Sequence, residues 1–276
     1  MAIILSKIQI LFLQRGIKIM TEMTKIEFWD SRAAIGEKSG TNDFLLKRLE
    51  LEMLLERVPE ESSVLDIGCG NGLTLLKLVQ EKGCTGVGID FSPEMIGLAQ
   101  QTVREHGFED KLSFCVGRVE ALESELGQFD IVLTERCLQN LDDGIMQHEA
   151  FLGIMKHVRI GGRYFMIEGF IEGLESINEL RCSLGLEKID PPWHNVFLNE
   201  ESVKNWATPE YVLEEIYPFS STYYFLSRVV YAKIAYDKGQ ELRYDSDINL
   251  VSCKLPPIGN FGPTRLYQWL KRSPVK

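Results

Sequence analysis

The pattern of apolar and polar positions predicts alternating strands and helices between residues 42 and 168. Short apolar runs indicate buried strands, and longer runs with apolar residues three or four positions apart indicate helices. The predicted strands are Val64–Gly68, Thr85–Asp90, Leu112–Val116, Phe129–Thr134 and Arg163–Glu168. The predicted helices are Asn42–Val58, Leu73–Glu81, Pro93–His106 and roughly Ile145–Val158. Strands this apolar, joined by helices, predict a parallel sheet covered on both faces.

The alternation changes after Gly169. Tyr211–Tyr217 and Thr264–Leu270 are predicted as a sixth and a seventh strand, with a helix-like run, Tyr223–Asp237, between them. Their short alternating patterns favour antiparallel pairing. We therefore expect an α/β fold with a seven-stranded sheet, mostly parallel with an antiparallel final strand and with helices on both faces. We expect residues 170–260 to form an insertion over the carboxyl edge of the sheet, on the substrate side.

The chain length, 276 residues, exceeds the usual domain size of about 100 to 200 residues, but α/β folds reach about 250 residues as one unit. One main domain over residues 23–276 is expected. Residues 2–13 are mostly apolar but too few to cross a bilayer core, which needs about 20 residues. They also lack the basic start and cleavage site of a signal peptide. We interpret residues 1–22 as a non-core extension, and residues 1–19 as an upstream-start artefact or poorly packed tail, because Met20 and Met23 offer later starts.

Composition narrows the class of partner. Apolar residues make up 45% of the chain and charged residues 25%, which excludes a disordered or collagen-like protein. The formal net charge of −10 disfavours a phosphate backbone, so a small molecule is the expected partner, with neither nucleic acid nor membrane. The six cysteines form no CxxC pair and the four histidines are dispersed. This predicts reduced thiols in a cytoplasmic protein and no metal site. The oligomeric state stays open.

The most informative stretch is VLDIGCGNG, from Val64 to Gly72. It places Gly68, Gly70 and Gly72 between a predicted strand and a predicted helix, where the backbone turns sharply and approaches a ligand. Asp90 ends the next strand, at the distance at which a carboxylate binds a ribose diol. A dinucleotide fingerprint would have glycine at Leu73, so an NAD-dependent dehydrogenase is disfavoured.

These residues resemble the class I S-adenosylmethionine-dependent methyltransferases, whose first motif reads much like DIGCGNG. The resemblance spans about residues 28–168 and implies a Rossmann-like sheet with S-adenosyl-L-methionine as cofactor. It implies that Asp90 binds the ribose. It places the other cofactor-binding residues in the first motif, around the adenine and beneath the methionine moiety, namely Asp66, Gly68, Cys69, Gly70, Phe91, Met95, Arg118, Val119 and Glu135. The family usually has Asp near Arg118, so this chain departs from the family pattern at the adenine edge.

A further likeness is to small-molecule methyltransferases linked to surface polysaccharide and sugar-nucleotide assembly. It rests on FWDSRAAIG with SGTND, on TERCLQNL, and on PPWHN with FLNEE. It implies O- or N-methylation of such an acceptor. Trp29 and Arg32 lie one helical turn apart and are predicted to close over the methionine end of the cofactor, with Arg32 neutralising its carboxylate. An alternative of equal weight is that Trp29 is a core residue and Arg32 a surface residue.

Three residues are candidate bases for an acceptor that must lose a proton: His194, Glu135 and Glu168. His194 lies in PPWHN, and the glutamates end predicted strands at the edge where such folds bind ligands. An ion pair between Glu135 and Arg136 is the structural alternative. An acceptor that is already an anion would need no base. A nucleotide-binding protein without catalysis is the alternative function.

Overall fold

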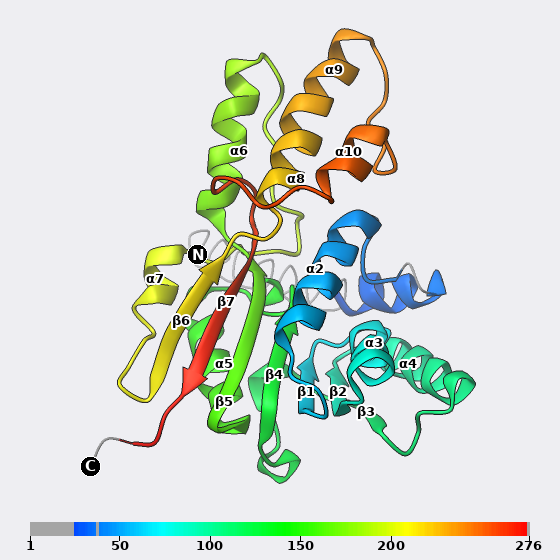
Figure 1. Ribbon diagram of the computed structural model, residues 1–276, viewed down its shortest axis with the longest axis vertical. Coiled ribbons are helices and arrows are strands. Elements are labelled where there is room, and N and C mark those ends of the chain that lie inside the picture. The colour runs from blue at the N-terminus through cyan, green and yellow to red at the C-terminus, as the bar shows by residue number, and fades with distance from the viewer. Residues whose placement is uncertain (1–24, 37–38, 275–276) are drawn as a thin grey trace, which may run out of the picture.

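The computed structural model describes residues 25–36 and 39–274 (Figure 1). The predictions for residues 1–22 and for the alternative starts lie outside the described residues. Residues 25–33 are helical and precede the labelled elements. Among the described residues, no helix is both long and apolar enough to cross a membrane.

The sheet has seven strands in the order β3-β2-β1-β4-β5-β7-β6. Neighbouring strands from β3 to β5 pair in parallel, and β7 is antiparallel to both β5 and β6. The predicted mixed sheet with its antiparallel end is confirmed. The strands are β1 Ser63–Ile67, β2 Thr85–Asp90, β3 Leu112–Val116, β4 Phe129–Glu135, β5 Val158–Gly169, β6 Tyr211–Tyr217 and β7 Thr264–Lys271.

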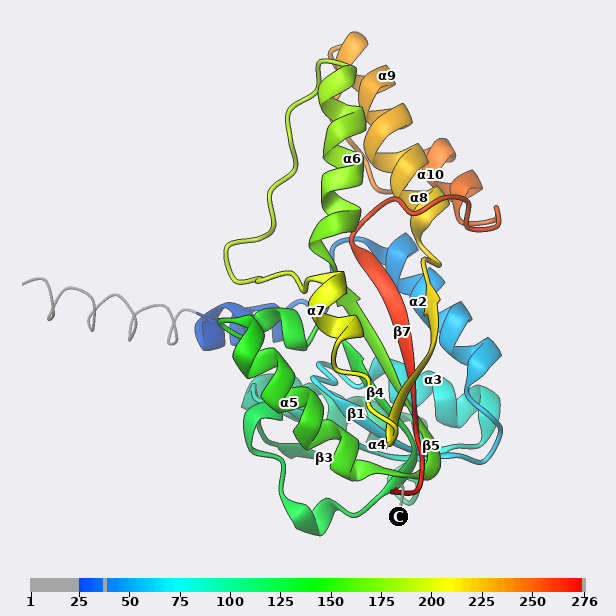
Figure 2. The same cartoon turned by 90° about the vertical axis from the view of Figure 1, so that its left-hand side faces the viewer.

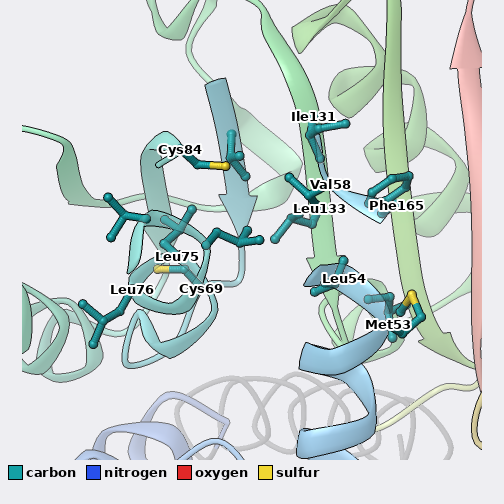
Figure 3. Packing of buried hydrophobic residues seen from close by; sticks show 14 of the residues in the cluster. Met53, Leu54, Val58, Cys69, Leu75, Leu76, Cys84, Ile131, Leu133 and Phe165 are labelled. Carbon is teal, nitrogen blue, oxygen red and sulfur yellow. The ribbon is translucent and has the colours of Figure 1, made fainter. Parts of the chain in front are cut away.

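Helices cover both faces of this sheet (Figure 2). One face packs against α2 (Phe44–Arg57), α3 (Leu73–Lys82) and α4 (Pro93–His106), and the other against α5 (Gly144–His157). Side chains alternate between the faces along each strand. In β1, Val64 faces the α2–α4 layer and Leu65 the α5 layer. Figure 3 shows the first of these layers, where Leu54 packs near Leu133 of β4.

The remaining helices stand beyond the carboxyl ends of the parallel strands, at the top of Figure 1. They are α6 (Ile171–Ser183), α8 (Ser221–Phe225), the π-helical turn η5 (Leu226–Tyr231), α9 (Ala232–Asp237) and α10 (Asp247–Ser252). The short helix α7 (Glu200–Lys204) precedes β6. The range expected as one insertion, 170–260, is therefore two excursions separated by β6. Hydrophobic periodicity did not indicate α7 or α10, because helices this short show too few turns.

One buried ionic contact ties these helices to the start of α2. Arg228 of η5 donates to the Asp43 carboxylate at 2.6 Å, and the Tyr223 hydroxyl donates to the same carboxylate at 2.6 Å. Asp43 is also the N-cap of α2, since its side chain accepts from the Leu46 amide. The upper helices thereby fix where α2 begins.

A second contact joins α6 to the loop that precedes β7. The Gly262 amide donates to the Gly173 carbonyl at 3.0 Å, so the loop before β7 lies directly on α6. A Cβ atom at Gly173 would lie 2.0 Å from the Gly262 carbonyl oxygen. Such close backbone approach requires glycine at this position.

We predict that Gly173→Ala lowers the free energy of unfolding by about 2 kcal/mol or more, because the added methyl group has no space against the Gly262 backbone. Gly153→Ala is the matched control, since Gly153 lies within α5 and its added Cβ would meet no atom within 4 Å. The control is expected to be neutral or to stabilise by up to about 1 kcal/mol, through helix propensity. Urea denaturation of both variants measures this. Equal stabilities would contradict the assignment.

Candidate functional site

A cavity of about 380 Å³ opens at the carboxyl ends of β1, β2 and β4. The strand order reverses between β1 and β4, and α/β sheets bind ligands in the crevice at such a switch point. Ten of the residues predicted from the sequence line this cavity, namely Trp29, Gly68, Cys69, Gly70, Asp90, Phe91, Met95, Arg118, Val119 and Glu135.

The glycine loop forms one wall, and its conformation explains its composition. Gly68, Gly70 and Gly72 all have left-handed φ angles, of 76°, 52° and 73°. Only glycine adopts this conformation routinely. The Gly68 and Cys69 amides both donate to the Ile89 carbonyl, at 2.7 and 3.0 Å, which ties the loop to β2. A Cβ atom at Gly70 would meet no atom within 4 Å, so open space borders the backbone there.

Asp90 is held at the end of β2 by backbone amides. One carboxylate oxygen accepts from the Gly70 amide at 2.9 Å and the other from the Ser92 amide at 2.9 Å. Burial raises the pKa of Asp90, and these amides oppose the rise. Each carboxylate oxygen has a second lone pair, so the fixed side chain can still accept hydrogen bonds from a diol in the cavity.

The predicted adenine site lies beside Asp90. Phe91 and Met95 line the cavity, and Met95 is 1% exposed at the start of α4. The Arg118 guanidinium lies over the Phe91 ring at 5.9 Å and pairs with Glu120 at 3.1 Å. Val119 is buried next to it. The apolar residues and the arginine plane therefore enclose one end of the cavity.

Glu135, at the end of β4, faces the α2–α3 side of the cavity. Its carboxylate accepts from Lys47 Nζ at 2.5 Å and from the Thr74 hydroxyl. Burial raises the pKa of Glu135, but Lys47, Arg136 and these hydrogen bonds outweigh it and lower the pKa below its ordinary value. A carboxylate held in this way is a weak base, which disfavours the predicted role in deprotonating an acceptor. The ion pair forms with Lys47, and not with the neighbouring Arg136 as the structural alternative expected.

Asp66 lies beneath this charged group and outside the cavity lining. It is 1% exposed, and within the described residues neither carboxylate oxygen has a hydrogen-bond partner. Burial raises its pKa well above the ordinary value, and the negative charge of Glu135 adds to the shift. Burial therefore favours the neutral form of Asp66.

The structure places Glu168 behind the cavity wall, which corrects the expectation that it faces an acceptor. Its side chain is fully buried, and it accepts hydrogen bonds from the amides of Cys137, Leu138 and Gln139 at 3.0, 3.0 and 3.2 Å. The carboxylate thus holds the turn after β4, whose Cys137, Asn140 and Leu141 line the cavity. Burial raises the pKa of Glu168 to about 7. Its position at a strand end indicated a ligand edge, but the side chain points to the opposite face of the sheet.

His194 and Arg32 also lie outside the cavity lining. The His194 ring packs against Phe28 and Trp29, with ring centroids 4.8 and 5.7 Å apart. Because Trp29 lines the cavity, His194 contacts that wall from behind. Arg32 donates to the Ser39 carbonyl at 2.8 Å and to Asn42, so it stabilises the turn before α2. The predicted roles of His194 as base and Arg32 at the cofactor carboxylate stay predictions.

Two functional candidates were missed from the sequence, Lys47 and Thr74. Both line the cavity and bind Glu135. The signal for Lys47 was available, because Lys47 and Glu50 lie three positions apart within a predicted helix that packs on a sheet. No local pattern indicated that Lys47 pairs with Glu135 of β4, since the two residues are 88 positions apart.

Comparison with known proteins agrees with this geometry. Residues 60–190 match the family model of a methyltransferase domain. Among solved structures, an S-adenosylmethionine-dependent methyltransferase from Clostridium acetobutylicum superposes with a TM-score of 0.54 at 12% identity, covering 86% of this chain and 94% of that one. The cyclase SpnF superposes with a TM-score of 0.54 at 17% identity, covering 81% and 80%. The chain has the methyltransferase fold.

Similarity to a curated protein is confined to part of the chain. Norajmaline N-methyltransferase of Rauvolfia serpentina is 40% identical over 105 residues, which are 38% of this chain and 35% of that protein. The match thus spans about a third of the length of the first curated relatives.

The raised pKa of Glu168 predicts a pH-dependent stability. Its pKa rises from 4.5 to about 7 on folding, so the folded state binds the proton more tightly and the contribution is fully present below pH 4.5. That contribution is lost as the pH rises through 7, by about 3 kcal/mol for a shift of this size. Urea denaturation from pH 4 to pH 8 measures it.

In Glu168→Gln this pH-dependent loss should disappear, because the amide does not titrate. Glu109→Gln is the control, since Glu109 lies at an exposed turn, and it should follow the wild type at every pH. A wild-type profile that parallels Glu168→Gln would show that Glu168 does not exchange a proton in this range.

Proposed function

We propose that the protein is an S-adenosylmethionine-dependent methyltransferase that methylates an oxygen or nitrogen of a small molecule. The observation that carries the proposal is the Asp90 carboxylate, which lines the cavity and is fixed by the Gly70 and Ser92 amides beside a loop of three left-handed glycines. Pairing of a glycine loop with an acidic residue on the next strand suits the ribose of a nucleoside. The methyltransferase family match over residues 60–190 supports the same reading.

The residues present fit the adenosyl group. Asp90 would accept from the ribose hydroxyls, Phe91 and Met95 would contact the adenine, and the Gly68–Gly70 backbone would lie along the methionine part. When bound, S-adenosylmethionine supplies an electrophilic methyl group. The chain's own contribution is to hold an acceptor atom in line at close range, and positioning of this kind accounts for much of catalysis.

For the acceptor we propose a sugar nucleotide or a polysaccharide precursor. The support is the likeness of FWDSRAAIG, TERCLQNL and PPWHN to methyltransferases of that kind. Parts of these segments lie near one another. Trp29 and Leu141 line the cavity, and Trp193 and His194 pack on the helix that carries Trp29.

The second candidate function is a protein that binds the nucleoside without transferring a methyl group. The fold accommodates it, because a neighbour with the same fold is named a cyclase and not a methyltransferase. An extract of small molecules incubated with the protein and methyl-labelled S-adenosylmethionine separates the two. Labelled product supports methyl transfer, and binding without product supports the alternative.

We predict that Asp90→Ala weakens S-adenosylhomocysteine binding at least about tenfold, through loss of charge-assisted hydrogen bonds to the ribose. Asp130→Ala is the matched control. Asp130 also accepts from a backbone amide, that of Ser63 at 2.8 Å, but it lies at the opposite, amino-terminal edge of the sheet. Isothermal calorimetry gives both affinities. Unchanged affinity in Asp90→Ala, or an equal loss in both variants, would sink the ribose assignment.

A further inference from the structure

Arg136 occupies an unusual backbone conformation at the cavity wall. It follows Glu135, lines the cavity and has a left-handed φ of 56°, which non-glycine residues rarely adopt. Hydrogen bonds hold it there, because its amide donates to the Ile167 carbonyl at 2.8 Å and its carbonyl accepts from Asn140 at 2.6 Å. Such strain persists where surrounding structure maintains it, and it concentrates at functional sites.

A buried glutamate directs the Arg136 side chain. Glu50 of α2 has a fully buried side chain, and one of its oxygens binds Arg136 Nη1. Lys47, one turn earlier, lies 4.0 Å from Glu50 and 2.5 Å from Glu135. The four groups alternate in sign and balance in charge, so Arg136 stays a cation in a cavity that also holds carboxylates.

The guanidinium retains capacity for a ligand. It carries five N–H donors in a planar fork that matches carboxylate and phosphate groups. Among the described residues its hydrogen bond is made by Nη1, and its side chain is 22% exposed at the cavity. A partly desolvated arginine of this kind binds an oxyanion more strongly than one on the surface.

The position of Arg136 separates it from the nucleoside. The glycine loop and Asp90 follow β1 and β2, on one side of the switch point, whereas Arg136 follows β4 and its amide bonds to β5 on the other side. Building on the proposed function, we infer that Arg136, directed by Glu50, binds an anionic group of the methyl acceptor, a carboxylate or a phosphate. This group would select acidic acceptors such as phosphorylated sugars or uronates over neutral sugars.

The test is a calorimetric titration of three probes that share one ring, glucose 1-phosphate, glucuronate and glucose, into protein saturated with S-adenosylhomocysteine. At least one anionic probe should bind at least about tenfold more tightly than glucose. Which anion binds distinguishes a phosphate from a carboxylate. Equal binding of all three, or binding of none, overturns the inference.

The variant is Glu50→Gln with Arg136→Gln, which removes both partners so that no buried charge is left unpaired. It should lose the preference for the anion while its affinity for S-adenosylhomocysteine stays within about twofold. Arg136→Lys, which keeps the charge but not the fork, should lose part of the preference. The control is Arg163→Gln with Glu214→Gln, a pair at 2.8 Å between β5 and β6 whose residues do not line the cavity. Circular dichroism verifies that each variant folds.

Two outcomes have distinct meanings. If Glu50→Gln with Arg136→Gln weakens S-adenosylhomocysteine tenfold, Arg136 binds the cofactor carboxylate and the inference is wrong. If the wild type fails to bind S-adenosylhomocysteine at all, the proposed function fails before the acceptor is tested. The cofactor titration is therefore done first.

Discussion

The hydrogen bond from the Gly70 amide to the Asp90 carboxylate is the contact on which the cavity depends. It joins the ends of two parallel strands, and the Gly68 amide adds a second link to the Ile89 carbonyl. Because three glycines adopt left-handed angles, the chain can turn sharply at this point. Open space borders Gly70 only, since Gly68 and Gly72 pack against Cys137 and Phe114. The position of the cavity at the switch point follows from the strand order.

Ion pairs hold together the opposite wall of the cavity, which α2 and the end of β4 form. Glu50 and Glu135 would each be costly to bury alone, and each is compensated by a cation, Arg136 or Lys47. Removing one partner of such a buried pair costs about 3 to 5 kcal/mol, so α2 and the end of β4 are held together strongly. Asp66 stays outside this balance because burial favours its neutral form. The wall can thus present an arginine to the cavity without a net charge inside the protein.

Local sequence patterns were sufficient to predict most of the fold. The five parallel strands and the antiparallel end follow from apolar runs and their spacing, and Ser92 with Pro93 marked the start of α4 where it begins. Gly68, Gly70 and Asp90, which line the cavity, were also predicted from sequence, because a turn that approaches a ligand restricts residue type at fixed positions. The extent of the upper helices was less well predicted, since β6 returns to the sheet between them.

The sequence by itself therefore determined the sheet, its order of elements and the cavity wall that contains the glycine loop and Asp90. Only the tertiary structure decided which charged residues face that cavity. Glu135 and Glu168 both end buried strands, yet one enters the cavity wall and the other supports a turn from behind it, because side chains alternate between the faces of a sheet. The partners of those carboxylates come from distant segments, Lys47 from α2 and the amides of the turn after β4. Contacts at such separations arise from packing and leave no local pattern in the sequence.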